Sequence, residues 1–404
     1  MDMIPPFADP ISTPMVRIKL LLLCVCFGLP PAQATPYLPT SDAQVLERLP
    51  FKANDPVARE LAQLRSVLQR NPRDAEAAVA LGRRYYEMVA AEGDPRYLGY
   101  AQAALAPWWE MATPPVEIQV LRAGLRQFRH DFSGAMSDLN QVLTRDPSHA
   151  RARSLRAIIH IVQARYNEAQ SDCLALRSSA NELVALGCET MVQGLTGHAA
   201  EAYSALSQML ARHPQASREE RLWVLIRLGE MAQRLGRPDA EAHFKQALAL
   251  DISDTFLLAA YADYLLDQGR AREVVNLLKD KTRSDTLLLR LVFAEHALKL
   301  PNVKASAATL AARFHAAQLR GDTVHQQEEA RFALHIQNDP KAALRLAQAN
   351  WQVQLEPRDA RIFLEAALAA RDPAAAKPVL RWLAESGIED TQLRRLAQQL
   401  KALP

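Results

Sequence analysis

The chain has 404 residues, of which 49% are hydrophobic and 6% aromatic, and only 14 are glycine. This length allows two or three globular domains or one long solenoid, and the abundance of alanine and leucine favours a mostly helical solenoid. The formal net charge is only +3, with basic and acidic residues mixed along the chain, which argues against a nucleic-acid-binding protein with a clustered basic face.

The N-terminus has the pattern of a secretory signal sequence over residues 1–34. Arg17 and Lys19 precede an apolar run at residues 20–29, and Ala32-Gln33-Ala34 offers a small-x-small cleavage site. We expect cleavage after Ala34 and export across the inner membrane into the periplasm. The apolar run is shorter than the about 20 residues that span a bilayer, and no other run of that length follows. We therefore expect no stable membrane insertion after cleavage, with an uncleaved anchor as the alternative.

Two short segments flank this signal. Residues 1–14 contain two aspartates and four prolines, unlike the basic start of a signal sequence, which favours Met15 as the true start. Residues 35–55 contain three further prolines and little periodicity, so we expect an extended lead-in. A helix should begin at Pro56, because proline suits the first helical position and leucines follow at spacings of three and four.

An internal repeat organises the next part of the chain. Several matching residues stand 34 positions apart, which indicates stacked copies of one supersecondary unit. The pairs are Arg122 and Arg156, Phe132 and Tyr166, Ala135 and Ala169, and Leu139 and Cys173.

The repeat resembles the tetratricopeptide repeat (TPR), a helix–turn–helix unit of about 34 residues. Leu81-Gly82 and Leu228-Gly229 match the same part of the family pattern, although the family's tryptophan in the first helix is absent from every unit. Other helix-pair solenoids therefore remain an alternative. The resemblance implies an all-α, right-handed solenoid of stacked antiparallel helix pairs. We expect TPR-like repeats at 56–280 and divergent helical repeats with a C-terminal cap at 281–404. Counted from the first full unit, which begins at Asp74, units two, three and four occupy about 114–147, 148–178 and 181–214.

No sequence motif points to catalysis or to a cofactor. The chain lacks a glycine-rich phosphate loop, a His-Glu-x-x-His pair and a Gly-x-Ser-x-Gly turn. Its ten histidines are scattered singly, without the spacing of metal ligands. We expect a protein that is not an enzyme and that has no catalytic residues, cofactor or metal site.

Two cysteines remain after removal of the signal, Cys173 and Cys188. They fall on the second helix of one unit and the first helix of the next, which should pack side by side. Neighbouring thiols usually pair in an oxidising compartment. The sequence leaves two alternatives, a disulfide between the two units or two separately buried cysteines.

The resemblance also suggests where a partner would bind. In TPR proteins the first helices line a concave groove, so an extended protein or peptide segment is the expected ligand. Apolar residues of units three and four, Ile161, Met191 and Leu195, should face the same side. The candidate groove contacts are Arg83, Tyr86, Glu87, Gln127, Phe128, Arg151, Ser154, Ile158, Glu230, Gln233, Arg234, Asp263 and Asp267.

These patterns favour a non-enzymatic protein-interaction scaffold of the bacterial envelope, with a partner that the sequence does not identify. One alternative is an enzyme or enzyme subunit with a site in residues 284–404, where His325, Glu328 and Glu329 are the candidate titratable groups. A second alternative is a small-ligand receptor, which would require a closed cavity rather than an open groove.

Overall fold

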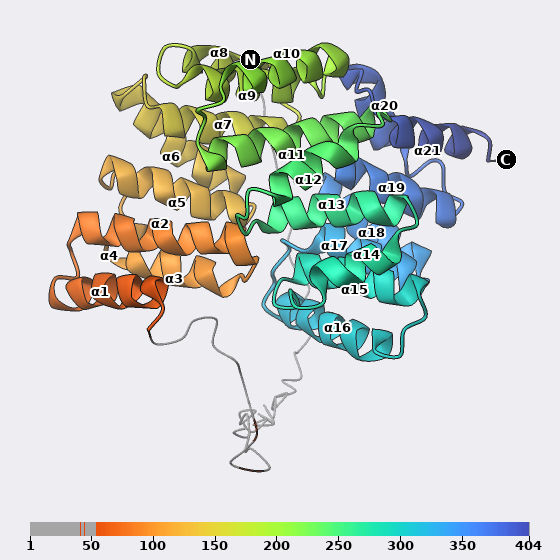
Figure 1. Ribbon diagram of the computed structural model, residues 1–404, viewed down its shortest axis with the longest axis horizontal. Coiled ribbons are helices and arrows are strands. Elements are labelled where there is room, and N and C mark those ends of the chain that lie inside the picture. Colours follow the sequence, from red (N-terminus) through yellow and green to blue (C-terminus); the bar gives the residue numbers. More distant parts are fainter. Residues whose placement is uncertain (1–40, 42–43, 45–53, 404) are drawn as a thin grey trace, which may run out of the picture. The chain divides into compact units, whose positions relative to one another are not determined.

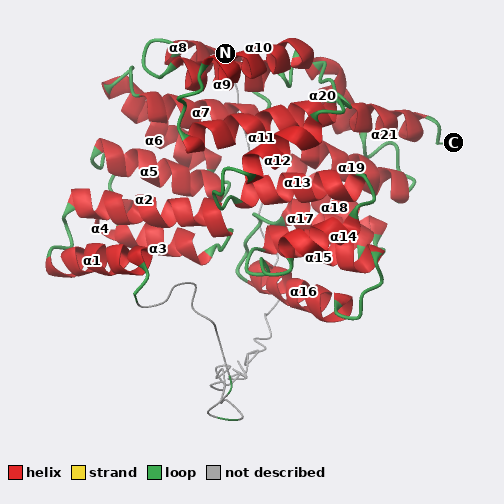
Figure 2. Cartoon of the chain, viewed as in Figure 1, coloured by secondary structure: helices red, strands yellow, loops and turns green. Residues whose placement is uncertain are grey.

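Helices form all of the regular secondary structure in the part of the chain that the computed structural model describes, which is residues 54–403 with Ser41 and Gln44 (Figure 2). The expected signal sequence and almost all of the lead-in lie outside the described residues. The first ten helices are α1 (Pro56–Arg70), α2 (Ala75–Glu92), α3 (Arg96–Ala104), α4 (Ala106–Trp109), α5 (Val116–Phe128), α6 (Phe132–Arg145), α7 (Ala150–Val162), α8 (Tyr166–Leu176), α9 (Glu182–Gln193) and α10 (Ala199–Arg212).

The remaining helices continue to the C-terminus without a change of class. They are α11 (Arg218–Arg234), α12 (Ala240–Leu248), α13 (Thr255–Asp267), α14 (Ala271–Leu278), α15 (Asp285–Ala297), α16 (Val303–Leu319), α17 (Gln326–His335), α18 (Pro340–Trp351), α19 (Pro357–Ala369), α20 (Lys377–Ser386) and α21 (Thr391–Lys401). The expected fold class is confirmed, because successive helices pair and stack as an all-α solenoid. None of the described helices is both long enough and apolar enough to cross a bilayer.

The 34-residue repeat has a physical basis in a repeated ion pair. In α5 the Arg122 Nε and Nη2 atoms donate to both carboxylate oxygens of Asp138 in α6, at 2.9 and 2.6 Å. In the next unit Arg156 binds Asp172 in the same way, at 2.8 and 2.6 Å. The first pair is almost fully buried, at 3% and 2% side-chain exposure. A bidentate arginine–carboxylate pair has fixed geometry, so it sets how the second helix of each unit lies on the first.

The turns inside the helix pairs also share one geometry. In seven of these turns a residue in the left-handed conformation lies between the two helices, and the next amide donates back to a carbonyl five residues earlier, as in a Schellman-type helix end. The residue is a glycine in some units but not in others. The left-handed residues of these seven turns are His130, Ala164, Gly197, Gly236, Gly269, Lys299 and Arg371. The last two lie in the divergent region, where the family pattern fades but the turn is kept.

Small residues allow the helices to approach closely. Ala123, Ala135, Ala157 and Ala169, the repeated alanines, have no solvent exposure. Such contacts are needed because packed helices lie only about 8–10 Å apart.

The solenoid does not stay an open array. Figure 1 shows the chain rising from α1 to α10, descending from α11 to α16 and turning back through α17 to α21. The last turn of α2 meets the loop before α13, where the Ser253 hydroxyl donates to the Ala91 carbonyl at 2.9 Å. A side chain at Gly93, the residue that follows α2, would collide with Ser284. The end of α2 and the turn after it are therefore in contact with the starts of α13 and α15.

The C-terminal helices return to the third and fourth units. The Leu355 amide donates to the Val162 carbonyl at 2.8 Å, and Trp382 Nε1 donates to the Tyr166 hydroxyl at 3.1 Å. One hydrophobic core contains side chains from α7 to α9 together with side chains from α17 to α21. The regions 56–280 and 281–404 consequently belong to one compact unit, which runs from Ala53 to Pro404.

A disulfide joins units three and four. The sulfur atoms of Cys173 in α8 and Cys188 in α9 lie 1.96 Å apart and their Cα atoms 5.3 Å apart. Both residues are buried in the core that the C-terminal helices share. Of the two alternatives left by the sequence, the structure contains the bridge.

We expect this bridge to stabilise the fold by about 3 kcal/mol, because cross-linking a loop of roughly 15 residues removes that much conformational entropy from the unfolded chain. Urea unfolding of the oxidised protein, compared with a Cys173→Ala/Cys188→Ala variant, measures the difference. The bridge itself is checked by mass spectrometry after alkylation. Modification of both thiols in unreduced protein would show that it is absent.

Gly229 should tolerate no side chain. Its added Cβ would lie 2.7 Å from Phe244 Cε1, and the Phe244 ring is completely buried. We expect Gly229→Ala to destabilise the protein by about 1–3 kcal/mol through overpacking. Gly99→Ala is the matched control, because no atom lies within 4 Å of its added Cβ and a helical alanine should stabilise by about 0.5–1 kcal/mol. Thermal unfolding distinguishes the two, and equal midpoints would contradict the packing described here.

Candidate binding cavity

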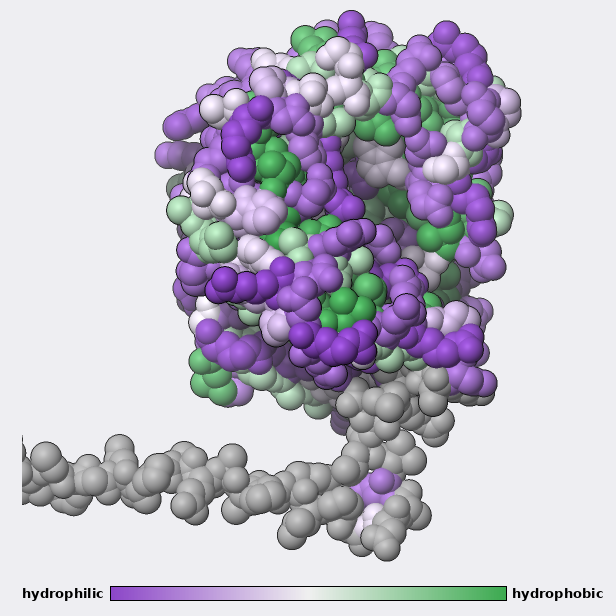
Figure 3. Space-filling model, turned by 90° about the vertical axis from the view of Figure 1, so that its left-hand side faces the viewer, coloured by the Kyte–Doolittle hydropathy of each residue, from purple (hydrophilic) through white to green (hydrophobic). Residues whose placement is uncertain are grey.

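The closed winding of the solenoid encloses a cavity of about 1720 Å³. Its walls come from the first helices of successive pairs and from three later segments, 320–328, 354–365 and 390–395. Solvent reaches it, since the Arg358 side chain lines the cavity and is 49% exposed. Ligand pockets for small molecules usually measure about 300–1,000 Å³, so this space can take a larger ligand. In the side view, the outer face is mostly hydrophilic, with hydrophobic side chains visible in its depressions (Figure 3).

The structure divides the candidate groove residues between two sites. The larger group lines the cavity and consists of Gln127, Phe128, Glu230, Gln233, Arg234, Asp263 and Asp267. The apolar residues Ile161, Met191 and Leu195 line the same cavity. Four others line a separate pocket of about 190 Å³: Tyr86, Arg151, Ser154 and Ile158. Arg83 and Glu87 line neither space and form ion pairs with Glu117 and Arg84. The described helices therefore do not form one continuous open groove.

In the smaller pocket, Tyr86 lies close to Phe128 and Arg151. Its ring meets the Phe128 ring edge-on at 5.2 Å. Burial raises the pKa of the Tyr86 hydroxyl, while the nearby Arg151 guanidinium acts in the opposite direction. The two aromatic residues thus contact each other and connect the pocket with the cavity wall.

Arginines from the C-terminal half donate hydrogen bonds to the two candidate aspartates of α13. Asp263 accepts from Arg290 Nη2 at 2.6 Å and from Arg331 Nη2 at 2.8 Å. Burial alone would raise the Asp263 pKa, but the two guanidinium groups outweigh it and hold the pKa below its ordinary value. Asp267 accepts from both terminal nitrogens of Arg361 at 2.7 and 2.9 Å. These contacts join the walls of the cavity.

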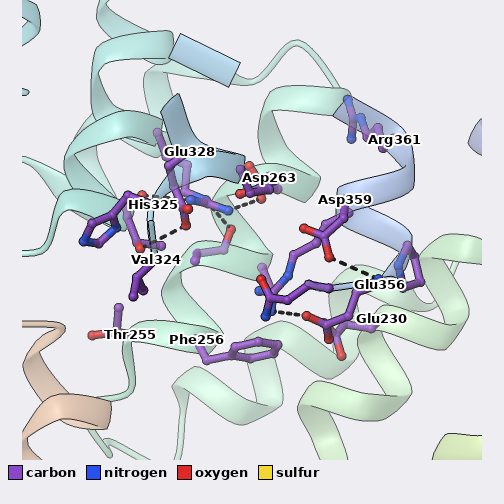
Figure 4. A pocket seen from close by; sticks show the side chains of 18 of the residues that line it. Glu230, Thr255, Phe256, Asp263, Val324, His325, Glu328, Glu356, Asp359 and Arg361 are labelled. Atoms are coloured by element: carbon purple, nitrogen blue, oxygen red, sulfur yellow. Dashed lines mark hydrogen bonds and ion pairs between the residues drawn. The ribbon is translucent and has the colours of Figure 1, made fainter. Parts of the chain in front are cut away.

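Phe256 is one of the side chains that line the cavity (Figure 4), and two arginines contact its ring. The Arg227 guanidinium carbon is 4.6 Å from the centre of its ring and that of Arg358 is 5.6 Å away, which is the range of cation–π contacts. Arg227 pairs with Glu230 at 3.0 Å and Arg358 with Glu356 at 2.7 Å. Both arginines are therefore oriented by two contacts each.

Glu328 differs from these acids because no arginine or lysine nitrogen of the described residues lies within 4 Å of it. Its side-chain hydrogen bond is a long one, from the Thr286 hydroxyl at 3.4 Å. Glu328 and Glu356 line the same cavity. Burial lowers the pKa of the His130 imidazole, and Glu328 and Glu356 partly oppose that shift.

Asp359 is the most unusual group of the cavity wall. It is 2% exposed, and its Oδ2 atom accepts from the Glu356 amide at 3.1 Å. Its Oδ1 atom is buried, and the Asn350 side-chain amide lies close to the carboxyl group. Burial, reinforced by the charge of Glu356, raises the Asp359 pKa to about 8, with Arg358 acting in the opposite direction. Sequence patterns gave no reason to select this residue.

The three titratable residues proposed for the enzyme alternative do not converge. His325 and Glu328 line the cavity, whereas Glu329 is buried against Gln318, whose Nε2 donates to it at 2.6 Å. Burial raises the Glu329 pKa. Within residues 54–403, Ser41 and Gln44, no three metal-ligating side chains are grouped as a metal ion would require.

Comparisons with known proteins add little to this geometry. No protein-family model and no curated protein matches the chain. Among solved structures it is similar to the crystal structure of the P58(IPK) TPR domain, with 16% identity over 86% of this chain and 98% of that chain and a TM-score of 0.22. A TM-score this low carries no argument about binding. The TPR-like assignment rests on the helix pairs and their 34-residue offset.

The raised Asp359 pKa predicts a pH-dependent stability. The unfolded chain releases the Asp359 proton near the ordinary pKa of 3.8, but the folded chain keeps it up to about 8. Between these values the folded state binds more protons, so rising pH favours unfolding. We expect Asp359→Asn to be increasingly more stable than wild type as pH rises through this window, with no further gain above it.

Thermal unfolding over this pH range measures the effect. Glu201→Gln, which removes an exposed carboxylate from α10, is the control and should follow wild type at every pH. A constant difference between Asp359→Asn and wild type would mean that Asp359 is ionised in the folded protein.

Proposed function

We propose that the protein is a non-enzymatic interaction scaffold of the bacterial envelope that holds a segment of a protein partner inside the cavity. The proposal keeps the concave face of the TPR-like solenoid as the binding surface. It replaces a groove open along its length with a space walled by both halves of the chain.

The observation that carries this proposal is the size and composition of the cavity. At about 1720 Å³ it exceeds the usual volume of a small-molecule pocket. Ile161, Met191 and Leu195 supply an apolar wall, while ion-paired side chains of α11, α13 and α19 supply a polar one. A polypeptide segment presents apolar, polar and charged groups together, so it can use both walls.

Two observations support an envelope location. The N-terminal residues fit a secretory signal, and the disulfide between Cys173 and Cys188 is of the kind that persists in oxidising compartments. N-terminal sequencing of the protein isolated from its cell should begin at Thr35. Recovery of an uncut N-terminus in the cytoplasmic fraction would contradict export.

A small-ligand receptor is the second candidate function, and one observation favours it. Residues of the first helix pair and of the C-terminal helices both line the cavity. A small-ligand receptor requires a cavity with walls on several sides, which an open groove lacks. Native mass spectrometry separates the two candidates, since a receptor would carry a bound compound of low mass.

Site-specific photocrosslinking tests the binding of a polypeptide segment. A photoreactive amino acid at Gln268, an exposed residue of the cavity wall, should form adducts that map to one recurrent polypeptide segment. The matched control is the same amino acid at Leu319, which is 76% exposed and does not line the cavity. Equal yields from both positions, or adducts without a common segment, would contradict the proposal.

A further inference from the structure

We propose that the smaller pocket, between α2, α5 and α7, binds a compact organic carboxylate, an apolar group that carries one carboxylate. Arg151 is the partner of that carboxylate, and the Tyr86 and Ser154 hydroxyls line the same pocket. This inference goes beyond the proposed function, because it assigns a ligand to a space separate from the cavity. At about 190 Å³ the pocket is smaller than the about 300–1,000 Å³ of drug-sized sites, so it suits a small ligand.

Arg151 is a cation without an anionic partner. In the part of the chain that the structure describes, its side chain makes no hydrogen bond and no ion pair. The other two arginines near the start of α7, Arg153 and Arg156, both pair with Asp172. A guanidinium has five donors and no acceptor, and its planar fork matches the two oxygens of a carboxylate. The position therefore favours an anion, and a carboxylate above all.

Two hydroxyl groups complete the polar side of the pocket. Arg151 lies close enough to Tyr86 to oppose the rise that burial causes in the Tyr86 pKa. The Tyr86 ring is fixed by Phe128, 5.2 Å away, and by the backbone of Gly124, where an added Cβ would lie 3.1 Å from the ring. Among the described residues, neither the Tyr86 nor the Ser154 hydroxyl forms a hydrogen bond. Each can therefore donate one to a ligand.

The rest of the pocket is apolar. Val120 and Leu121 of α5 are each 2% exposed, and the half-buried Leu155 and Ile158 of α7 lie at the same space. A bare inorganic anion would leave these side chains uncovered, whereas an apolar body would remove them from water, which is favourable. A ligand with an amine would be repelled by Arg151. The lining as a whole therefore fits a carboxylate on an apolar body.

NMR titration of the full chain, with its isoleucine δ1 methyl groups isotopically labelled, tests the inference. Ile158 lines the pocket, whereas Ile362 is buried in the core that contains the C-terminal helices. With hydrocinnamate, a phenyl ring on a propanoate chain, we expect a saturable shift of the Ile158 signal and none of the Ile362 signal. Hydrocinnamide has the same body without the charge and should bind about tenfold more weakly.

Substitutions locate the carboxylate. Arg151→Gln removes the charge from an exposed side chain and should weaken hydrocinnamate binding about tenfold or more. Arg272→Gln is the matched control, because Arg272 is also an exposed second residue of its helix, α14, but lines neither the pocket nor the cavity. Tyr86→Phe keeps the ring beside Phe128 and should weaken binding about three- to tenfold. Each variant is first shown to unfold at the wild-type temperature.

A peptide that ends in phenylalanine separates two sources of this chemistry, a free acid and the C-terminal residue of a polypeptide. If the peptide binds more tightly than hydrocinnamate and loses this on amidation of its end, the source is a polypeptide; the reverse order indicates a free acid. Either result supports the site.

Three results would overturn the inference. They are no saturable shift of Ile158 with either acid, equal binding of hydrocinnamate and hydrocinnamide, and equal effects of Arg151→Gln and Arg272→Gln. None of them bears on the capture of a segment in the cavity, which the photocrosslinks at Gln268 test.

Discussion

The return of the C-terminal helices to the third and fourth units is the constraint on which the cavity depends. The Leu355 amide bonds to Val162 and the Trp382 indole to Tyr166, so these late segments lie against the middle of the repeat array. The shared core of α7 to α9 and α17 to α21 makes this return part of the fold. Buried apolar surface supplies the stability, and the concave side of the repeats becomes an interior wall.

Ion pairs between distant segments determine how that wall is assembled. Asp263 and Asp267 of α13 bind Arg331 and Arg361 from helices that follow much later in the chain. Removing two charges from water costs much of what their attraction gains, so such pairs add little net stability. Their directional hydrogen bonds instead favour one alignment of the segments. The same contacts occupy two aspartates that the repeat pattern assigned to a partner.

The sequence predicted what depends on local periodicity. The 34-residue offset identified the helix pairs, and the closeness of Cys173 and Cys188 followed from adjacent units. Applied further, that offset could have identified Asp138 and Asp172 as partners of the repeated arginines. Arg358 could not be found in this way, because its contact with Phe256 of α13 joins positions more than ninety residues apart. Asp359 could not be found either, because its raised pKa depends on burial in the closed fold beside Glu356. No periodic signal records which segments meet when a solenoid closes on itself.

The most direct measurement of this closure is a double-mutant cycle between Asp267 and Arg361, which are 94 positions apart and form a bidentate ion pair. Urea unfolding of Asp267→Asn, Arg361→Gln and the double variant gives their coupling energy. The closed arrangement predicts a coupling of about 0.5–3 kcal/mol, the range for contacting residues. Additive effects of the two substitutions would mean that α13 and α19 do not meet, and that the cavity is not formed as described.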